Sequence, residues 1–354
     1  MLEHGVTFAS SDEDAFNLQP PVSGVIKDAQ VRGSPLVMRS LLGYVAASRA
    51  ALGGSKAFMD ATKYLVSNML RSMSKKLEIE LLYGQSGYGT VSAVSGATIT
   101  ITTAEWAPGI WAGAERMPLE IRDTTGATSR GEFTVQAVNM DTRVVTLTSS
   151  AASAGVVATD VVWHKGAYGN EFPGIHKILT QTSGSLFNID VGSYNLFKGN
   201  EYDASAAALS FNKLNSAVAR AVEKGLDGKV LALCNPRGWA NMLQDQAALR
   251  RYDGSYSPSK MENGSKAIVF HSQNGDIEIE PSIYVKESHC FLLALDDWMR
   301  IGSTDMTFKR PGQGEEFFRD LENSAAYELR LYTDQALFCM APGRSVLIKN
   351  IVNS

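Results

Sequence analysis

Apolar residues recur at spacings of three and four between residues 55 and 83. This is the period of an α-helix with one buried face, so the sequence predicts one uninterrupted helix, roughly 43 Å long at ~1.5 Å per residue. Ser55 is suited to be its N-cap, and Gly84 to be the residue after its last turn. A helix this long with a single stripe needs a long flat partner such as a sheet; we call it the spine helix. The stripe consists of Phe58, Ala61, Leu65, Met69, Met73, Leu77 and Leu81.

The period changes to two after residue 84. Between residues 85 and 165, short alternating runs such as ATITITT and GEFTVQAV are separated by turn signals such as Ser95-Gly96 and Pro108-Gly109. Five to six short strands at this spacing predict a small antiparallel β-barrel or sandwich. The helical pattern of apolar residues ends before this stretch, and a mixed helix-and-strand pattern begins near residue 166. We therefore expect residues 85–165 to form an inserted domain.

Residues 166–298 mix the two periods. A helical run, SAAALSFNKLNSAVARAVEKGLDG, is followed by the buried-strand run KVLALC and by a second helix with Asn235 as N-cap and Pro236 in its first turn. Further strands are predicted at AIVFHS, DIEIEPSIYV and CFLLAL. This order predicts an α/β domain around a mixed sheet.

The last segment, residues 299–354, has the pattern of strands again. The run AAYELRLYTDQALFC alternates apolar and polar residues, which is typical of a half-buried antiparallel strand. It is long enough to lie along the spine helix. We therefore expect residues 55–84 and 299–354 to form one domain that is discontinuous in sequence.

The segments before the spine helix have too few apolar residues for a core of their own. Residues 1–24 contain acidic residues, Ser, Pro20-Pro21 and isolated aromatics, and predict an extended arm that gains order by lying on something else. Residues 25–54 contain turn signals at Gly33-Ser34-Pro35 and Gly43, and predict a protruding hairpin-like loop. The alternative is a short helix over residues 36–52.

Composition excludes several classes of protein. The chain has 354 residues, 44% of them hydrophobic and 20% charged, and a net charge of −4, which argues against a dedicated nucleic-acid reader. Neither a secretory signal nor an apolar run of membrane-spanning length is apparent. Cys234, Cys290 and Cys339 are far apart in apolar surroundings, which predicts buried thiols in a reducing compartment.

The sequence contains no strong catalytic or ligand-binding motif. The five histidines lack metal-ligand spacing, and the glycines of GQSGYG lack the Lys-Ser/Thr of a phosphate-binding loop, which favours a hinge into the inserted domain. Asp296-Asp297 and Glu315-Glu316 are adjacent pairs on predicted strands, so their members point to opposite faces. We therefore predict no catalytic residue, no metal site and no cofactor.

The succession of elements resembles the major capsid protein of tailed bacteriophages, the Hong Kong 97 type of fold. The stretches that carry the resemblance are SKAFMDATKYLVSNMLRSMSKKLEIELLYGQSG, GKVLALCNPRGWANMLQDQAALRRYDGSYS and the run from RIGSTDMTFKRPG to GRSVLIK. The resemblance implies an α+β capsid fold. Its parts would be an N-terminal arm (1–24), an extended loop (25–54), a spine helix (55–84), an inserted barrel (85–165), an axial domain (166–298) and a peripheral sheet (299–354).

The resemblance also implies a structural role without enzymatic activity. The protein would assemble with itself into pentamers and hexamers of an icosahedral shell, in the cytoplasm of a host bacterium, around packaged double-stranded DNA. Further expected partners are a portal protein, a separate scaffolding protein, because the arm is too short to hold a helical scaffolding segment, and a decoration protein unless the barrel replaces it. Cross-linking through Lys27 or Lys56 is not expected.

Subunit contacts are expected where the extended loop of one copy lies over the spine domain of the next. The apolar residues of this contact are Val31, Leu36, Val37, Met38 and Tyr44, and the charged residues that set its register are Arg32, Arg39 and Arg49. Three alternatives stay open: an encapsulin-like nanocompartment shell, an α/β enzyme with a barrel accessory domain, and a surface adhesin built on the barrel.

Overall fold

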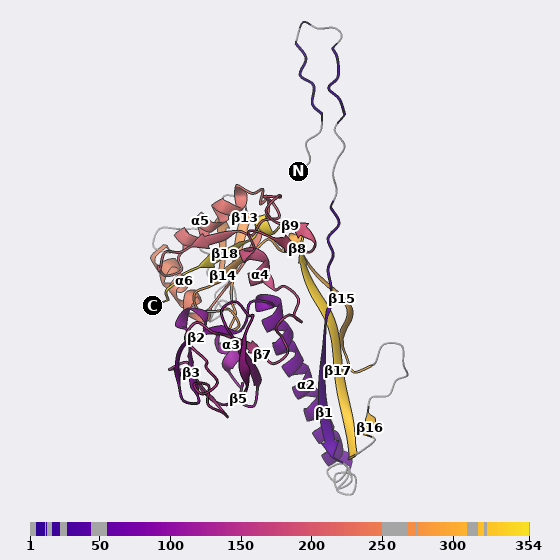
Figure 1. The fold of residues 1–354 in the computed structure, drawn as a ribbon. Helices are drawn as coiled ribbons and strands as arrows, with labels where there is room; N and C mark the ends of the chain where they lie inside the picture. The colour runs from indigo at the N-terminus through magenta and orange to yellow at the C-terminus, as the bar shows by residue number, and fades with distance from the viewer. Residues whose placement is uncertain are drawn as a thin grey trace.

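The computed structural model describes residues 5–10, 12, 16–21, 27–43, 55–249, 268–272, 275–309, 318–321 and 324–353. They form an α+β structure in which a barrel and a mixed-sheet domain lie on one side of a long helix and a long sheet runs beside it (Figure 1).

The spine helix has the predicted bounds. Helix α2 runs Ser55–Tyr83. Met69, Met73 and Leu77 of its stripe are buried and pack on the sheet, whereas Ile79, Leu82 and Tyr83 enter a larger core shared with the barrel. Leu65 and Leu81 are half-buried, and the side chains of Phe58 and Ala61 lie outside the described residues.

The end of this helix differs from the expectation. Gly84 still donates its N–H to the Glu80 carbonyl at 2.7 Å, and the first residue with a left-handed backbone is Gln85, at φ 61°. Gly84 is needed for another reason: a Cβ there would collide with the carbonyl oxygens of Phe172 and Glu80. Close backbone approach, rather than a helix-terminating conformation, explains this glycine.

The segment after α2 forms a closed antiparallel barrel with the strand order β2-β3-β6-β5-β4-β7. The sequence predicts five or six strands here, and the structure has six. Trp106 and Trp111 stack inside the core beside the barrel, with ring centroids 5.7 Å apart; Trp111 ends helix α3 (Pro108–Trp111), between β3 and β4. The strands are β2 (Gly89–Ser95), β3 (Thr98–Ile101), β4 (Pro118–Arg122), β5 (Ser129–Asn139), β6 (Val144–Leu147) and β7 (Val161–His164).

The axial domain is built on a mixed six-stranded sheet with the order β10-β18-β14-β11-β13-β12. Asn235 caps the second helix as predicted, because its Oδ1 accepts the N–H of Arg237 at 3.0 Å. The strands are β10 (Glu201–Asp203), β11 (Val230–Cys234), β12 (Ile268–Ser272), β13 (Gly275–Pro281), β14 (Cys290–Leu293) and β18 (Val346–Lys349). The helices are α4 (Ile175–Thr180), α5 (Phe211–Val222) and α6 (Pro236–Leu249).

Strand β18 corrects the predicted domain boundary. We assigned residues 299–354 to the peripheral sheet, but β18 pairs with β10 and β14 inside the axial sheet. Val346, Leu347 and Ile348 are all buried, so this strand is covered on both faces. A central position explains its continuous apolar run, which a half-exposed strand would not have.

The peripheral sheet packs on α2 and is the long flat partner that the single apolar stripe of this helix requires. Strand β17 (Ser324–Cys339) pairs with β1 (Ser34–Gly43), with β15 (Trp298–Thr307) and with the short β16 (Arg319–Leu321). Leu329 and Leu331 of β17 form a core with Met69, Met73 and Leu77 of α2. A small hairpin, β8 (Ser185–Leu186) with β9 (Ile189–Asp190), covers the upper end of the sheet through Phe187.

Strand β1 is the second departure from expectation. All ten of its residues pair with β17, so residues 34–43 are part of the chain's own sheet rather than a protruding loop. The alternative of a helix is wrong over residues 36–43. The pairing arises because β17 offers an edge that β15 does not occupy.

The three cysteines are free and buried, which confirms the predicted burial of the thiols. Within the described part of the chain, no helix combines the length and apolar composition needed to cross a membrane.

Candidate assembly surfaces

The N-terminal arm projects from the body of the molecule (Figure 1). Its described segments, 5–10 and 16–21, run side by side, and the N–H of Gln19 donates to Thr7 Oγ1 at 2.9 Å. Phe8 is 94% exposed and Leu18 79% exposed. Aromatic and aliphatic side chains held this far from any core are the mark of a surface that another molecule covers.

The base of the arm is fixed to its own subunit. Gln30 donates its N–H to the Phe187 carbonyl at 2.9 Å, and Ala29 and Val31 pack against the main core. Ser34 Oγ donates to the Asn170 carbonyl. Residues 29–34 are therefore fixed to the body of the subunit.

The two faces of β1 differ. Leu36 and Met38 pack against the core between sheet and spine helix, whereas Val37 is 56% and Leu41 54% exposed on the opposite face. The sequence predicts Leu36, Val37 and Met38 in one contact, but the pleat of the strand directs alternate side chains to opposite faces. Of the other predicted contact residues, Val31 is half-buried on its own core, Arg32 and Arg39 are exposed, and Tyr44 and Arg49 lie outside the described residues.

Arg39 belongs to a charged cluster on that exposed face. Its Nε lies 3.5 Å from Oε1 of Glu328, and Nη2 of Arg330 lies 2.7 Å from Oε2. The hydrogen bond from Arg330 holds the pKa of Glu328 below its usual range, so the carboxylate is ionised. Two guanidinium groups around one carboxylate leave this surface positively charged, between the exposed Val37 and Leu41.

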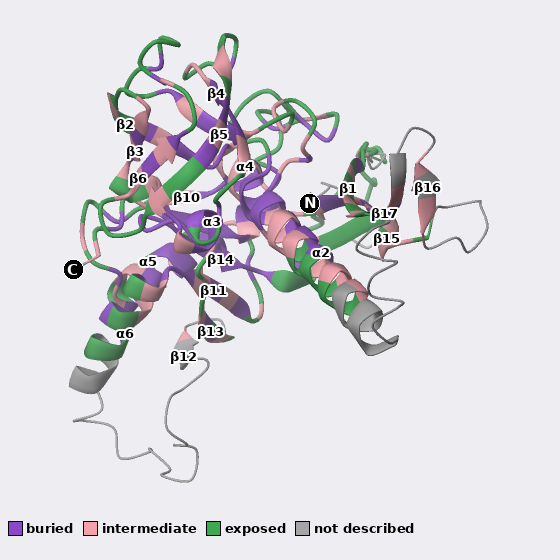
Figure 2. Cartoon of the chain, turned by 90° about the horizontal axis from the view of Figure 1, so that it is seen from below, coloured by how far each residue is buried: buried purple, intermediate pink, exposed green. Residues whose placement is uncertain are grey.

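A groove of about 730 Å³ runs along the outer side of α2. Its apolar lining comes from Val66, Leu70 and Tyr284, its basic lining from Lys63, Arg71 and Lys75, and its acidic lining from Glu78. Figure 2 shows exposed residues along this side of α2, with buried residues gathered toward the barrel. The helix is therefore covered by the sheet on one side and open on the other.

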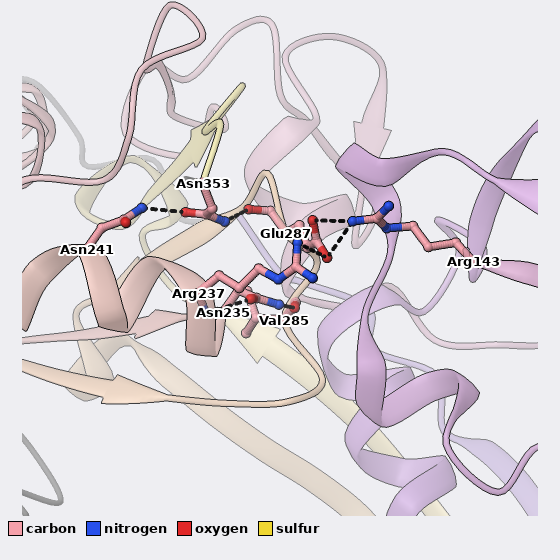
Figure 3. Close-up of polar contacts among 7 residues, drawn as sticks. All are labelled: Arg143, Asn235, Arg237, Asn241, Val285, Glu287 and Asn353. Atoms are coloured by element: carbon pink, nitrogen blue, oxygen red, sulfur yellow. Dashed lines mark hydrogen bonds and ion pairs between the residues drawn. The ribbon is translucent and has the colours of Figure 1, made fainter. Parts of the chain in front are cut away.

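A polar junction fixes the barrel to the axial domain (Figure 3). Nη2 of Arg143, in the turn between β5 and β6, lies 3.4 Å from both carboxylate oxygens of the buried Glu287. Nη1 of Arg237 in α6 lies 3.6 Å from Glu287 Oε1, and Asn353 donates to the Glu287 carbonyl at 2.7 Å. The barrel, α6 and the C-terminal segment thus meet at one residue, Glu287, which gives the inserted domain a fixed orientation.

A second junction buries ionisable groups where barrel, spine helix and axial domain meet. Nζ of Lys286 lies 3.4 Å from Oε2 of Glu105 and 4.5 Å from the centroid of the Tyr83 ring. The rings of His176 and His289 are 5.0 Å apart, and burial lowers the pKa of His289 to about 3. The neutral histidines and the Lys286–Glu105 pair act as packing and bridging groups between three parts of the fold.

Perturbed ionisable groups also mark catalytic sites, so these deserve comparison with one. Catalysis needs such groups to face a substrate cavity. The described cavities lie on the outer side of α2 and are lined by none of Tyr83, His176, Lys286 or His289. Among the described residues, no group of three or more His, Cys, Asp or Glu side chains is placed to hold a metal ion.

Comparison with solved structures decides the fold. The capsid subunit of cyanophage A-1(L) superposes with a TM-score of 0.54 at 10% identity, over 99% of this chain and 86% of that one. This chain has a phage-capsid fold. The resemblance inferred from the order of elements is therefore confirmed at the level of the fold.

Two further structures match with lower TM-scores. The capsid of a native GTA particle matches at 8% identity and a TM-score of 0.46, over 99% of this chain and 84% of that one. An encapsulin from Synechococcus elongatus matches at 12% identity and a TM-score of 0.28, over 43% of this chain and 53% of that one. No family model matches the sequence, and no curated protein does.

Sequence reasoning missed several residues of these surfaces. Leu41 has a detectable signal, since it follows Val37 and Arg39 at a spacing of two. Glu287 has no such signal. Its partner Arg143 lies 144 residues earlier in the sequence and its partner Arg237 lies 50 residues earlier, and only the fold brings them together.

Proposed function

We propose that this chain is the major capsid protein of a tailed bacteriophage. It assembles into pentamers and hexamers of an icosahedral shell that encloses double-stranded DNA, and its role is structural rather than enzymatic. The observation that carries the proposal is the projecting arm with exposed Phe8 and Leu18 on a subunit of phage-capsid fold. A subunit of this shape buries its apolar arm only when a neighbour receives it.

Assembly would rest on many modest contacts. Burial of each exposed apolar side chain stabilises the contact by ~25 cal/mol per Å² of apolar area removed from water. The arginine cluster of Arg39, Glu328 and Arg330 would set register more than strength, because pairs near a rim are partly solvated. Repeated contacts that close into a shell make weak interfaces persistent.

The same proposal names the expected partners. A closed shell with packaged DNA requires a portal protein for entry, and we expect a separate scaffolding protein during assembly in the host cytoplasm. The barrel is fixed to the axial domain through Arg143 and Glu287, so it would stand at a constant angle on the virion. A decoration protein would bind at or beside the barrel, unless the barrel replaces it.

Expression of the full chain with its phage's scaffolding protein tests the function. We expect megadalton particles in sedimentation and a closed shell by electron microscopy. Particles from infected cells should contain phage DNA; a cargo enzyme in place of nucleic acid would favour the nanocompartment. A stable monomer under all these conditions would contradict shell formation.

A further inference from the structure

Two of the three cysteines lie opposite each other in the axial sheet. Cys234 is the last residue of β11 and Cys290 is the first residue of β14, and the antiparallel register pairs them directly. Both thiols are free and fully buried. The two residues are far apart in the sequence, so only the fold brings them together.

The side chains of this pair share one face of the sheet, as directly opposed residues of an antiparallel pair do. Cys234 and Cys290 both belong to the core formed with α5, whereas their strand neighbours Leu233 and Phe291 pack into the core shared with the barrel. Burial raises the pKa of Cys290, and the charge of Cys234 raises this pKa further. The two thiols are therefore close enough to interact.

The backbone separation suits a disulfide bond. Directly opposed residues of an antiparallel pair have Cα atoms about 4.5 Å or about 5.5 Å apart, depending on whether they exchange hydrogen bonds. A disulfide bond accepts Cα separations of about 4.4 to 6.8 Å. Both values lie within this range, so the bond requires rotation of the side chains but no change in strand pairing.

The present hydrogen bond of Cys234 is a weak one. Its Sγ donates to the Glu280 carbonyl at 3.7 Å, and a thiol is a poor donor. Little is therefore lost when Cys234 turns toward Cys290. Cys339 offers a comparison within the same chain, because it is equally buried but the residue opposite it in β15 is Trp298.

We propose that Cys234 and Cys290 form a cross-strand disulfide bond when the protein is exposed to a peroxide. One thiol attacks the peroxide, whose oxygen–oxygen bond breaks, and the products are a sulfenic acid and one molecule of water. The second thiol attacks the sulfenic sulfur and releases a second molecule of water. The two sulfurs together lose two electrons, and the peroxide gains them.

Burial makes this modification slow. It raises the pKa of Cys234 to about 12, and the thiolate is the form that attacks. The reaction therefore needs transient opening at the strand ends, where both cysteines lie. A bacterial cytoplasm keeps thiols reduced, so the bond would form after a particle is released. This timing rests on the proposed function, whereas the bond itself does not.

Counting free thiols in the full-length wild-type chain tests the bond. The folded chain is incubated with hydrogen peroxide, then unfolded in urea and labelled with N-ethylmaleimide. We expect the number of labelled cysteines to fall from three to one, with the loss of two hydrogen atoms and one cross-linked peptide pair containing Cys234 and Cys290. Cys339 is the matched control and should stay labelled.

Thermal unfolding provides a second readout. The bond closes a loop of about 57 residues, which should raise the melting temperature by roughly 5 °C. Dithiothreitol should reverse the shift. Oxidation should leave the melting temperature of Cys290→Ala unchanged and should still raise that of Cys339→Ala. The thiol count uses the wild-type chain, so it decides the question even where a variant fails to fold.

Three labelled cysteines after oxidation would overturn the inference, as would sulfinic acids on Cys234 or Cys290 without a bond between them. Equal loss of the Cys339 label would also overturn it, because oxidation would then not depend on an opposed thiol. None of these results bears on shell formation. A chain that forms the bond but no particle would leave the inference standing and contradict the proposed function.

Discussion

Arg143 in the barrel lies 3.4 Å from both carboxylate oxygens of Glu287 in the axial domain, 144 residues away along the chain. Both side chains are largely buried. This pair fixes the inserted domain relative to the rest of the subunit, so the barrel's position on a shell would be the same in every copy.

Arg143→Ala should lower the free energy of unfolding by about 3 kcal/mol, because it leaves the buried Glu287 with only the more distant Arg237. Urea unfolding measures the loss. Lys165→Ala is the matched control: it breaks the ion pair with Glu132, in which both partners are about half exposed, and should cost no more than about 1 kcal/mol. Equal losses in the two variants would show that the Arg143 contact does not stabilise the fold.

Val37→Asp should leave subunit stability within about 0.5 kcal/mol of wild type and prevent shell assembly, because Val37 is exposed on the face away from the spine helix. Thermal unfolding of the unassembled chain and sedimentation of the assembly mixture measure the two effects. Normal particles from this variant would exclude the outer face of β1 from the subunit contact.

Met38→Asp should destabilise the subunit itself, by about 2 kcal/mol, because Met38 packs on the core between β17 and the spine helix. The sequence alone places Met38 in the subunit contact, where this variant would fold normally and fail only in assembly. Comparison with Val37→Asp by urea unfolding separates the two faces of the strand; equal stability of the two variants would contradict the observed pleat.

Gly84→Ala should cost about 3 kcal/mol, since its methyl group would collide with the carbonyl oxygens of Phe172 and Glu80, and backbone atoms cannot move aside easily. Gly43→Ala in β1 is the control, because nothing lies within 4 Å of a Cβ there. Differential scanning calorimetry should show a lower melting temperature for the first variant and little change for the second.

The buried His289 predicts a dependence of stability on pH. Burial, and to a lesser extent nearby Lys286, lowers its pKa to about 3. Between about pH 6.5 and pH 3 the unfolded histidine binds a proton that the folded one does not, so its contribution to stability falls as the pH falls, by ~1.4 kcal/mol per pH unit.

The stability advantage of wild type over His289→Gln should therefore shrink by about 2 kcal/mol between pH 7 and pH 5, measured by urea unfolding. Phe291→Leu removes an apolar neighbour of His289 that does not titrate, and its effect should be the same at both pH values. A pH-independent difference for His289→Gln would mean that its pKa is not lowered.

The local periodicity of apolar residues was sufficient to predict the spine helix and the strands of the barrel. The spine helix could be bounded at residues 55 and 83 because its apolar residues repeat every three or four positions, and that spacing alone puts them on one side of a helix. The barrel could be recognised from short alternating runs between turn residues. In the helix the decisive interactions lie within a few residues. In the barrel the runs predict the strands, whereas its closure depends on pairs between non-consecutive strands, such as β3 with β6 and β2 with β7.

Which strands pair with one another was decided only by the tertiary structure. The pattern of β1 was compatible with a loop on another subunit and that of β18 with an edge of the peripheral sheet, yet one completes the sheet beside α2 and the other enters the axial sheet. The sequence of a strand indicates which of its side chains need burial, but not the sheet edge with which the strand pairs. Those edges, like the contact between Arg143 and Glu287, come from segments more than 50 residues away, and no local spacing records them.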